Sequence, residues 1–195
     1  MAHMSNDLSP GFADPVAGAQ ACFRAVLDAM ARPGRRMAVS GVAAPAPLCD
    51  AAAAVLLTLV DHETPLWLDP DAAAARNWIA FHTGAPVGGA LMDGAAFVMA
   101  LSLPDLAALP AGTDEMPETS ATVILQVKAL GSGRRYVLEG PGLRRATELR
   151  VDGLPADFVS NWQHNHGLFP RGVDLILCAG RSLAALPRSV SVSEG

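Results

Sequence analysis

The chain has 195 residues, of which 51% are hydrophobic and 17% are charged. A chain of this size and composition buries enough apolar surface to offset its ordering entropy, so we exclude global disorder and expect a single domain. The 14 basic and 19 acidic side chains give a formal charge of −5. This balance argues against a nucleic-acid-binding protein, because such proteins normally carry a basic excess.

The three cysteines, Cys22, Cys49 and Cys178, are far apart in the sequence and form no CxxC pair. This pattern predicts neither a disulfide framework nor a zinc ribbon, and it fits reduced thiols in a cytoplasm. The longest apolar run, 51–60, has ten residues, whereas a helix that crosses a bilayer needs about 20. We find no targeting segment, and we therefore expect a cytoplasmic protein without membrane contacts.

The clearest predicted element is a helix over Pro15–Ala31. Asp14 is placed to cap it, and proline suits the first helical position, where a missing N–H is not needed. Its apolar residues recur at helical spacing and predict a core-facing side: Val16, Ala19, Cys22, Phe23, Val26, Leu27 and Met30. The alanine-rich stretch Leu48–Val60 predicts a second helix, buried and closely packed through its small residues.

The rest of the chain mixes strands and helices. We predict strands at Pro65–Leu68, Ala95–Leu103, Thr122–Lys128, Arg135–Glu139, Val173–Cys178 and within Leu183–Val192, and helices from Asp71 to about His82 and from Asp157 to about His166. Gly131-Ser132-Gly133 predicts a hairpin turn between the third and fourth of these strands. The mixture predicts an α/β fold, a three-layer sandwich with a mixed sheet, with flexible ends at about 1–8 and 193–195.

Two strings rich in glycine and arginine, GSGRRY and GPGLRR, are candidate phosphate loops. Neither completes GxGxxG, and Lys128, the single lysine, has no glycine at the Walker spacing. The pairs Arg134/Arg135 and Arg144/Arg145 remain candidates for bidentate phosphate contacts. The alternative is that these arginines are simply solvated in their turns.

Metal ligands and nucleophiles are poorly supported by the sequence. A His-Glu pair at His62 begins like HExxH, but Pro65 would break the helix which that motif needs. His164 and His166 share a face only on an extended strand, and the cysteines fall on apolar elements, where thiols are usually inert. His82 lies at a helix end and either caps carbonyls or contacts a partner. We assign no metal ligand and no catalytic residue.

Six unusual strings occur in one order along the chain. They are DPVAGAQACFRAVLDAMARPGR, LLTLVDHETPLWL, FHTGAP, GTDEMPETSATVILQV, LEGPGL and FPRGVDLILCAGRSLAALPRS. Together they resemble PhnH, a family of subunits of the bacterial carbon–phosphorus lyase core complex, which serves phosphonate metabolism. The resemblance extends from about Asp14 to Val190.

The resemblance implies a fold like the large domain of pyridoxal-phosphate-dependent transferases, without that cofactor or any other. It implies a homodimer that assembles with the PhnG, PhnI and PhnJ subunits. The assembly makes a ribose 1-phosphonate 5-triphosphate from ATP and a phosphonate, and partner subunits then break the C–P bond. No catalytic residue of the family carries over to this chain.

The string FPRGVDL draws attention to Arg171, Gly172 and Asp174. Phe169-Pro170 predicts an extended approach to the strand, and Gly172 permits close passage of the backbone. A carboxylate at the start of a buried strand needs a partner. We expect Arg171 and Asp174 to shape a polar cleft or a subunit contact, and the alternative is a turn fixed by a bond from Asp174 to the backbone.

Three functions remain open at the level of sequence. The first is a non-catalytic structural subunit of the lyase complex. The second is a stand-alone enzyme or binding protein for a nucleotide or phosphate ester, which would use the arginine-rich turns. The third is a decayed pyridoxal-phosphate enzyme that still binds the cofactor.

Overall fold

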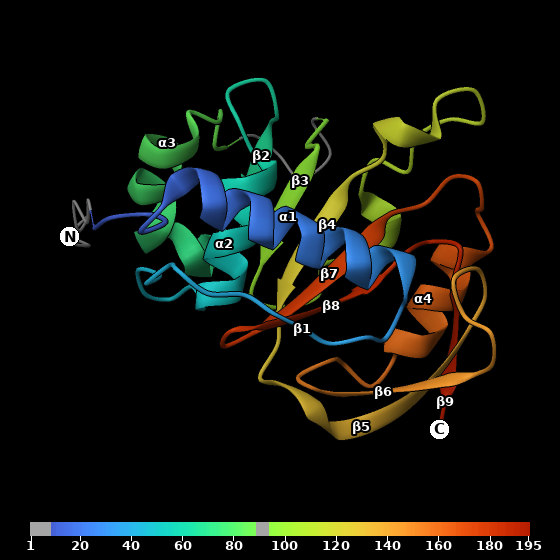
Figure 1. The fold of residues 1–195 in the computed structure, drawn as a ribbon. Helices are drawn as coiled ribbons and strands as arrows, with labels where there is room; N and C mark the ends of the chain where they lie inside the picture. The colour runs from blue at the N-terminus through green and yellow to red at the C-terminus, as the bar shows by residue number, and fades with distance from the viewer. Residues whose placement is uncertain (1–8, 89–93) are drawn as a thin grey trace.

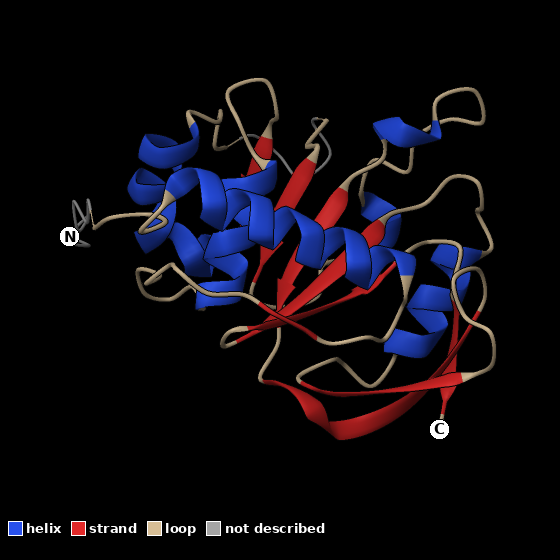
Figure 2. Cartoon of the chain, viewed as in Figure 1, coloured by secondary structure: helices blue, strands red, loops and turns tan. Residues whose placement is uncertain are grey.

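The fold is built around a six-stranded mixed sheet with the strand order β1-β8-β7-β4-β3-β2. The computed structural model describes residues 9–88 and 94–195. Strands β2, β3, β4 and β7 are parallel, whereas β8 runs antiparallel to β7, and β1 runs antiparallel to β8 (Figures 1 and 2). The bounds are Met37–Ala38 for β1, Leu66–Leu68 for β2, Phe97–Ala100 for β3, Thr122–Gln126 for β4, Asp174–Ala179 for β7 and Ser182–Leu186 for β8.

Helices α1 (Pro15–Ala31) and α2 (Asp50–Leu59) cover one face of this sheet (Figure 1). The start of α1 is as predicted, because the Asp14 carboxylate accepts hydrogen bonds from the backbone N–H groups of Val16 and Ala17. The six residues from Ala51 to Leu56 are fully buried. Small side chains allow α2 to pack closely beneath α1, as the composition of this segment predicted.

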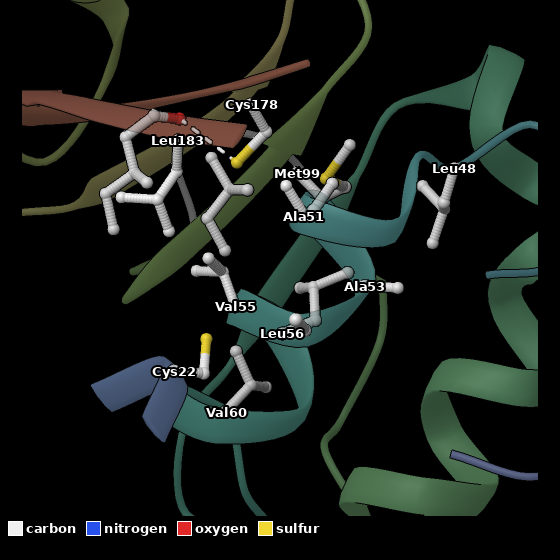
Figure 3. Packing of buried hydrophobic residues seen from close by; sticks show 14 of the residues in the cluster. Cys22, Leu48, Ala51, Ala53, Val55, Leu56, Val60, Met99, Cys178 and Leu183 are labelled. Carbon is white, nitrogen blue, oxygen red and sulfur yellow. Dashed lines mark hydrogen bonds between the residues drawn. The ribbon is translucent and has the colours of Figure 1, made fainter. Parts of the chain in front are cut away.

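The core on this face joins both helices to the sheet. Figure 3 shows Cys22 of α1 and Val55 of α2 on the same side as Met99, Cys178 and Leu183 of the strands. Helix α3 (Arg76–Thr83) adds Trp78 and Ile79 to this core. The helix predicted from Asp71 begins differently, because Asp69 caps a 3₁₀ segment, η1 (Pro70–Ala75), which then continues into α3.

The other face of the main sheet carries a second core. Helix α4 (Phe158–His166) lies there with a three-stranded antiparallel sheet ordered β6-β5-β9, which the sequence did not predict. Its strands are β5 (Ala129–Glu139), β6 (Thr147–Asp152) and β9 (Ser191–Glu194). Short 3₁₀ turns η2 (Leu106–Ala108) and η3 (Pro117–Thr119) connect β3 to β4. Strand β7 is buried between the two cores, which confirms the interpretation of its continuous apolar run.

The structure corrects the predicted hairpin. Gly131-Ser132-Gly133 lies within β5, at an irregularity in its pairing with β6 between Leu130 and Arg134. The turn of the hairpin is formed instead by residues 140–146, between β5 and β6. Glycines with positive φ suit a bulge as well as a turn, so the local signal was ambiguous.

The end of the chain also differs from the prediction. Pro187 separates β8 from β9, so the predicted strand within Leu183–Val192 serves two different sheets. Ser193 and Glu194, expected to be flexible, pair with Val137 and Tyr136 of β5. The expectation for residues 1–8 lies outside the described part of the chain. In the part that is described, no helix is both long and apolar enough to cross a membrane.

Candidate functional site

Asp174, a candidate from the sequence, is engaged by Arg188 at the start of β7. The guanidinium of Arg188 donates from Nη2 to Oδ2 of Asp174 at 2.6 Å and from Nε to Oδ1 at 3.2 Å. The backbone N–H of Arg188 also donates to Oδ1 at 2.7 Å. Both side chains are largely buried, with 18% and 15% exposed. Asp174 does accept a backbone bond, but it comes from Arg188, 14 residues along the chain, and not from a local turn.

Arg188 also fixes the long connection between β3 and β4. Its Nη1 donates to the carbonyl oxygen of Pro117 at 2.8 Å. A single guanidinium thus joins three segments that are distant in sequence, at 117, 174 and 188. Charge-assisted bonds of this kind, once desolvated, are stronger than bonds between neutral groups. The arrangement holds loops in place and leaves Asp174 few free acceptor sites.

Arg171 lies apart from Asp174 and has a different partner. Its Nε is 3.2 Å from Oδ1 of Asp114, and both side chains are substantially exposed. Such surface pairs stabilise a fold little. Arg171 and Asp174 therefore share no partner, and the expectation that they jointly shape one polar cleft gains no support from their contacts. The Arg171 side chain remains accessible to solvent.

Gly172 brings the turn against helix α4. Its φ is +108°, and a β-carbon there would lie 2.9 Å from the carbonyl oxygen of Asn165. The buried Asn165 side chain exchanges two hydrogen bonds with the backbone of Val173. The predicted extended approach through Phe169 is wrong, because its backbone N–H bonds to His166 and the segment forms a turn. Nothing in the sequence around Asn165 identified its role.

His82 contacts the N-terminal segment of the described chain. Its Nε2 lies 3.0 Å from the carbonyl oxygen of Ser9, which also accepts from Nε1 of Trp78. The rings of Trp78 and Phe81 flank the imidazole edge-on. His82 thus positions a chain segment.

Arg134 and Arg135 do not form a joint phosphate site. Arg134 donates to the carbonyl oxygen of Ala156 at 3.2 Å, whereas Arg135 pairs with Glu148 at 2.8 Å. As adjacent residues of β5 they point to opposite faces of its sheet. A bidentate clamp made by this pair alone is therefore excluded by the geometry.

The three thiols gather around one core. Cys22 and Cys178 are buried in it, and Cys49 packs against it. Burial raises the pKa of each thiol, most strongly for Cys178. A thiol kept protonated is a poor nucleophile. In the described ranges, no three His, Cys, Asp or Glu side chains are grouped so that they could hold a metal ion.

One side of α1 carries large apolar side chains that the core does not use. Val16, Phe23 and Leu27 are 72%, 47% and 51% exposed, whereas the buried residues of the helix are Cys22, Ala25, Val26 and Ala29. The sequence interpretation placed all the apolar residues of α1 on a single core side, and this is wrong for these three. We call Val16, Phe23 and Leu27 the α1 apolar face. The sequence did contain a sign of this exposed face, because the apolar residues of α1 are spread around more than one side of the helix.

Comparison with known proteins decides the family. The family model described as "Bacterial phosphonate metabolism protein (PhnH)" matches residues 10–193. The chain belongs to the PhnH family. The match covers both sheets and all four α-helices, so the whole described architecture is that of a PhnH protein.

Two relatives with curated names are similar over most of their length. The chain is 41% identical over 199 residues to "Alpha-D-ribose 1-methylphosphonate 5-triphosphate synthase subunit PhnH" of Rhizobium meliloti (strain 1021), with 100% of each chain covered. It is 34% identical over 179 residues to "Putative C-P lyase subunit protein HtxG" of Stutzerimonas stutzeri, which covers 89% of this chain and 85% of the relative. Both names describe subunits, which directs attention to surfaces such as the α1 apolar face.

Proposed function

We propose that this protein is a non-catalytic structural subunit of a carbon–phosphorus lyase complex for organophosphonate catabolism in the cytoplasm. Its membership of the PhnH family and the subunit names of both relatives support the pathway. The observation that carries the structural role is the α1 apolar face, a row of exposed apolar side chains on the longest helix. Contiguous exposed apolar surface of this kind marks interaction sites in soluble proteins.

The partners we propose are a second copy of this chain and the PhnG, PhnI and PhnJ subunits. Val16, Phe23 and Leu27 are spaced by seven and four residues, so they lie along one side of α1. Obligate interfaces are large and hydrophobic, and burial of a Phe or Leu side chain contributes about 1.5–3 kcal/mol. The α1 apolar face therefore suits a permanent contact better than a transient one.

The use of the titratable groups supports a non-catalytic role. Asp174 already accepts three hydrogen bonds from Arg188, and His82 is directed at the Ser9 carbonyl oxygen. Burial keeps the pKa of the Cys178 thiol high, which disfavours the reactive thiolate. These groups serve the fold, and the bond-breaking chemistry is assigned to partner subunits.

The proposal includes one domain and a relationship to the large domain of pyridoxal-phosphate-dependent transferases without their cofactor. A Schiff base would need the single lysine, Lys128, which is exposed just after β4. A Schiff-base lysine is normally desolvated in an apolar pocket, and Lys128 is not. This position therefore supports a role without that cofactor.

An affinity pull-down from phosphonate-grown cells of the source organism tests the proposal. Tagged wild-type protein should retain the other lyase subunits in stoichiometric amounts, as judged by mass spectrometry. Phe23→Glu should lose them, because it places a charge in the α1 apolar face. Met116→Glu is the matched control, since Met116 is 52% exposed and lies on a different segment.

Two results would contradict the proposal. Recovery of the wild-type protein without partners, in cells that express the lyase, would favour the stand-alone nucleotide-binding alternative. Equal loss of partners from Phe23→Glu and Met116→Glu would remove the special role of the α1 apolar face.

A further inference from the structure

Arginines from two distant parts of the chain surround one surface hollow. The hollow has a volume of about 410 Å³ and lies between the end of α1 and the turn that joins β5 to β6. Arg32 and Arg35 line it from the segment after α1, and Arg144 and Arg145 line it from the turn. We call these four residues and the space between them the arginine hollow.

A second hollow of about 230 Å³ adjoins the first and shares Gly34 with it. Arg36 and Arg150 line this second space, together with Glu148, whose carboxylate pairs with Arg135. Six arginines and one glutamate thus line the two hollows of a chain that has 14 basic and 19 acidic side chains. Positive charge is thus concentrated at the two hollows, although the protein as a whole has a net negative charge. Such a concentration of positive charge raises the local concentration of anions.

The backbone holds the two parts of the arginine hollow together. Gly142 in the turn has φ +83°, and a β-carbon there would run into the carbonyl oxygen of Ala31 at the end of α1. Glycine therefore permits an approach that no other residue allows. The arginines on either side are brought to a common space by this contact between backbones.

Several of these guanidinium groups have donors to spare. Arg32 pairs with Asp28, and Arg35 lies 4.0 Å from the same carboxylate. Within residues 9–88 and 94–195, the guanidinium groups of Arg144, Arg145 and Arg150 have neither a hydrogen bond nor an ion pair, although the backbones of Arg145 and Arg150 are bonded. Each guanidinium carries five N–H donors in a planar fork that matches phosphate oxygens.

We propose that the arginine hollow binds the di- or triphosphate group of a phosphorylated small molecule. Its volume is in the range of small-ligand sites, and converging arginines are the side chains that recognise phosphate bidentately. The concave shape favours a compact anion over an extended acidic segment of a protein. The choice of a triphosphate rests on the proposed function, because the name of one relative includes a ribose 5-triphosphate.

Isothermal titration of the full chain with tripolyphosphate, and in parallel with ATP, tests the site. We expect binding at one site per chain that weakens with added salt. Arg144→Gln/Arg145→Gln should weaken it about tenfold or more, because charge-assisted bonds are lost. Arg24→Gln/Arg134→Gln is the matched control, since it removes the same charge outside both hollows. A third variant, Arg35→Gln, should also weaken binding. It allows the site to be tested even if the double variant does not fold.

Three results would overturn the proposal: no binding of tripolyphosphate by the folded wild-type chain, equal loss in the test and control variants, or unchanged binding in Arg35→Gln and Arg144→Gln/Arg145→Gln. Loss of lyase subunits from Arg144→Gln/Arg145→Gln with unchanged tripolyphosphate affinity would assign the arginines to an acidic protein partner instead.

The titration can be read separately from the pull-down that tests the proposed function, because the titration uses the isolated chain. Binding without assembly would contradict the proposed function alone, and assembly without binding would contradict the site alone.

Discussion

Arg188 holds Asp174 with two guanidinium nitrogens and its own backbone N–H, at 2.6, 3.2 and 2.7 Å. The two residues are 14 positions apart, and they lie at the same end of the antiparallel β7–β8 pair, Asp174 at the start of β7 and Arg188 just after β8. The same guanidinium reaches Pro117, so the pair ties the connection between β3 and β4 to the sheet. We interpret Asp174 as a residue that orders loops at one end of the parallel strands.

The first prediction concerns this ion pair. Asp174→Ala should lower the free energy of unfolding by about 2–3 kcal/mol, because it leaves a largely buried guanidinium without its partner. Urea denaturation of the isolated chain measures the effect. Asp114→Ala is the control, and it should cost less than about 1 kcal/mol because its pair with Arg171 is exposed. Similar losses in both variants would show that the Asp174 pair is no stronger than a surface pair.

The second prediction compares two glycines with positive φ. Gly172→Ala should destabilise the protein by about 2 kcal/mol or more, since strain adds to a clash with Asn165. Gly180→Ala, at φ +54° with nothing within 4 Å of the new β-carbon, should cost only about 1–2 kcal/mol. Thermal unfolding monitored by circular dichroism compares the two directly. A smaller loss at Gly172 would mean that the turn moves away from α4 without penalty.

The third prediction concerns alkaline pH. Burial raises the pKa of the Cys178 thiol well above its usual 9.0, so the unfolded chain releases this proton first as the pH rises. The stabilisation is fully present below the unfolded pKa and is lost progressively as the pH rises from there through the raised folded pKa, so the free energy of unfolding should fall from about pH 8 to pH 10 and beyond. Urea denaturation at each of the two pH values measures this fall, and Cys178→Ala should lose less free energy of unfolding between them than the wild type. An equally steep decline would assign the effect to other groups.

The fourth prediction separates the two sides of α1. Val26→Ala should lower the free energy of unfolding by about 1–2 kcal/mol, because this side chain is 5% exposed and leaves a cavity. Leu27→Ala should change it by less than about 1 kcal/mol in the monomer, since Leu27 is 51% exposed. Urea denaturation at concentrations where sedimentation shows a monomer gives both values. A larger loss at Leu27 would place it in the core, as the sequence pattern first suggested.

Local signals were sufficient for several elements. Asp14 and Pro15 predicted the start of α1 because capping depends on neighbouring residues only. The continuous apolar run after Val173 predicted a strand covered on both faces, and β7 has that position. The six ordered strings indicated the PhnH family, and the family model confirmed it. Gly131-Ser132-Gly133 shows the limit, since one pattern of glycines serves both a turn and a bulge.

The sequence by itself thus determined the capped start of α1, the buried central strand and the family. Only the tertiary structure decided which apolar residues of α1 face solvent, that Arg188 is the partner of Asp174, and that Arg35 and Arg144 meet at one hollow. The reason is physical. The free energies of helix capping and backbone propensity depend on residues that are neighbours in the sequence. Burial and ion pairing depend on contacts between residues that are distant along the chain.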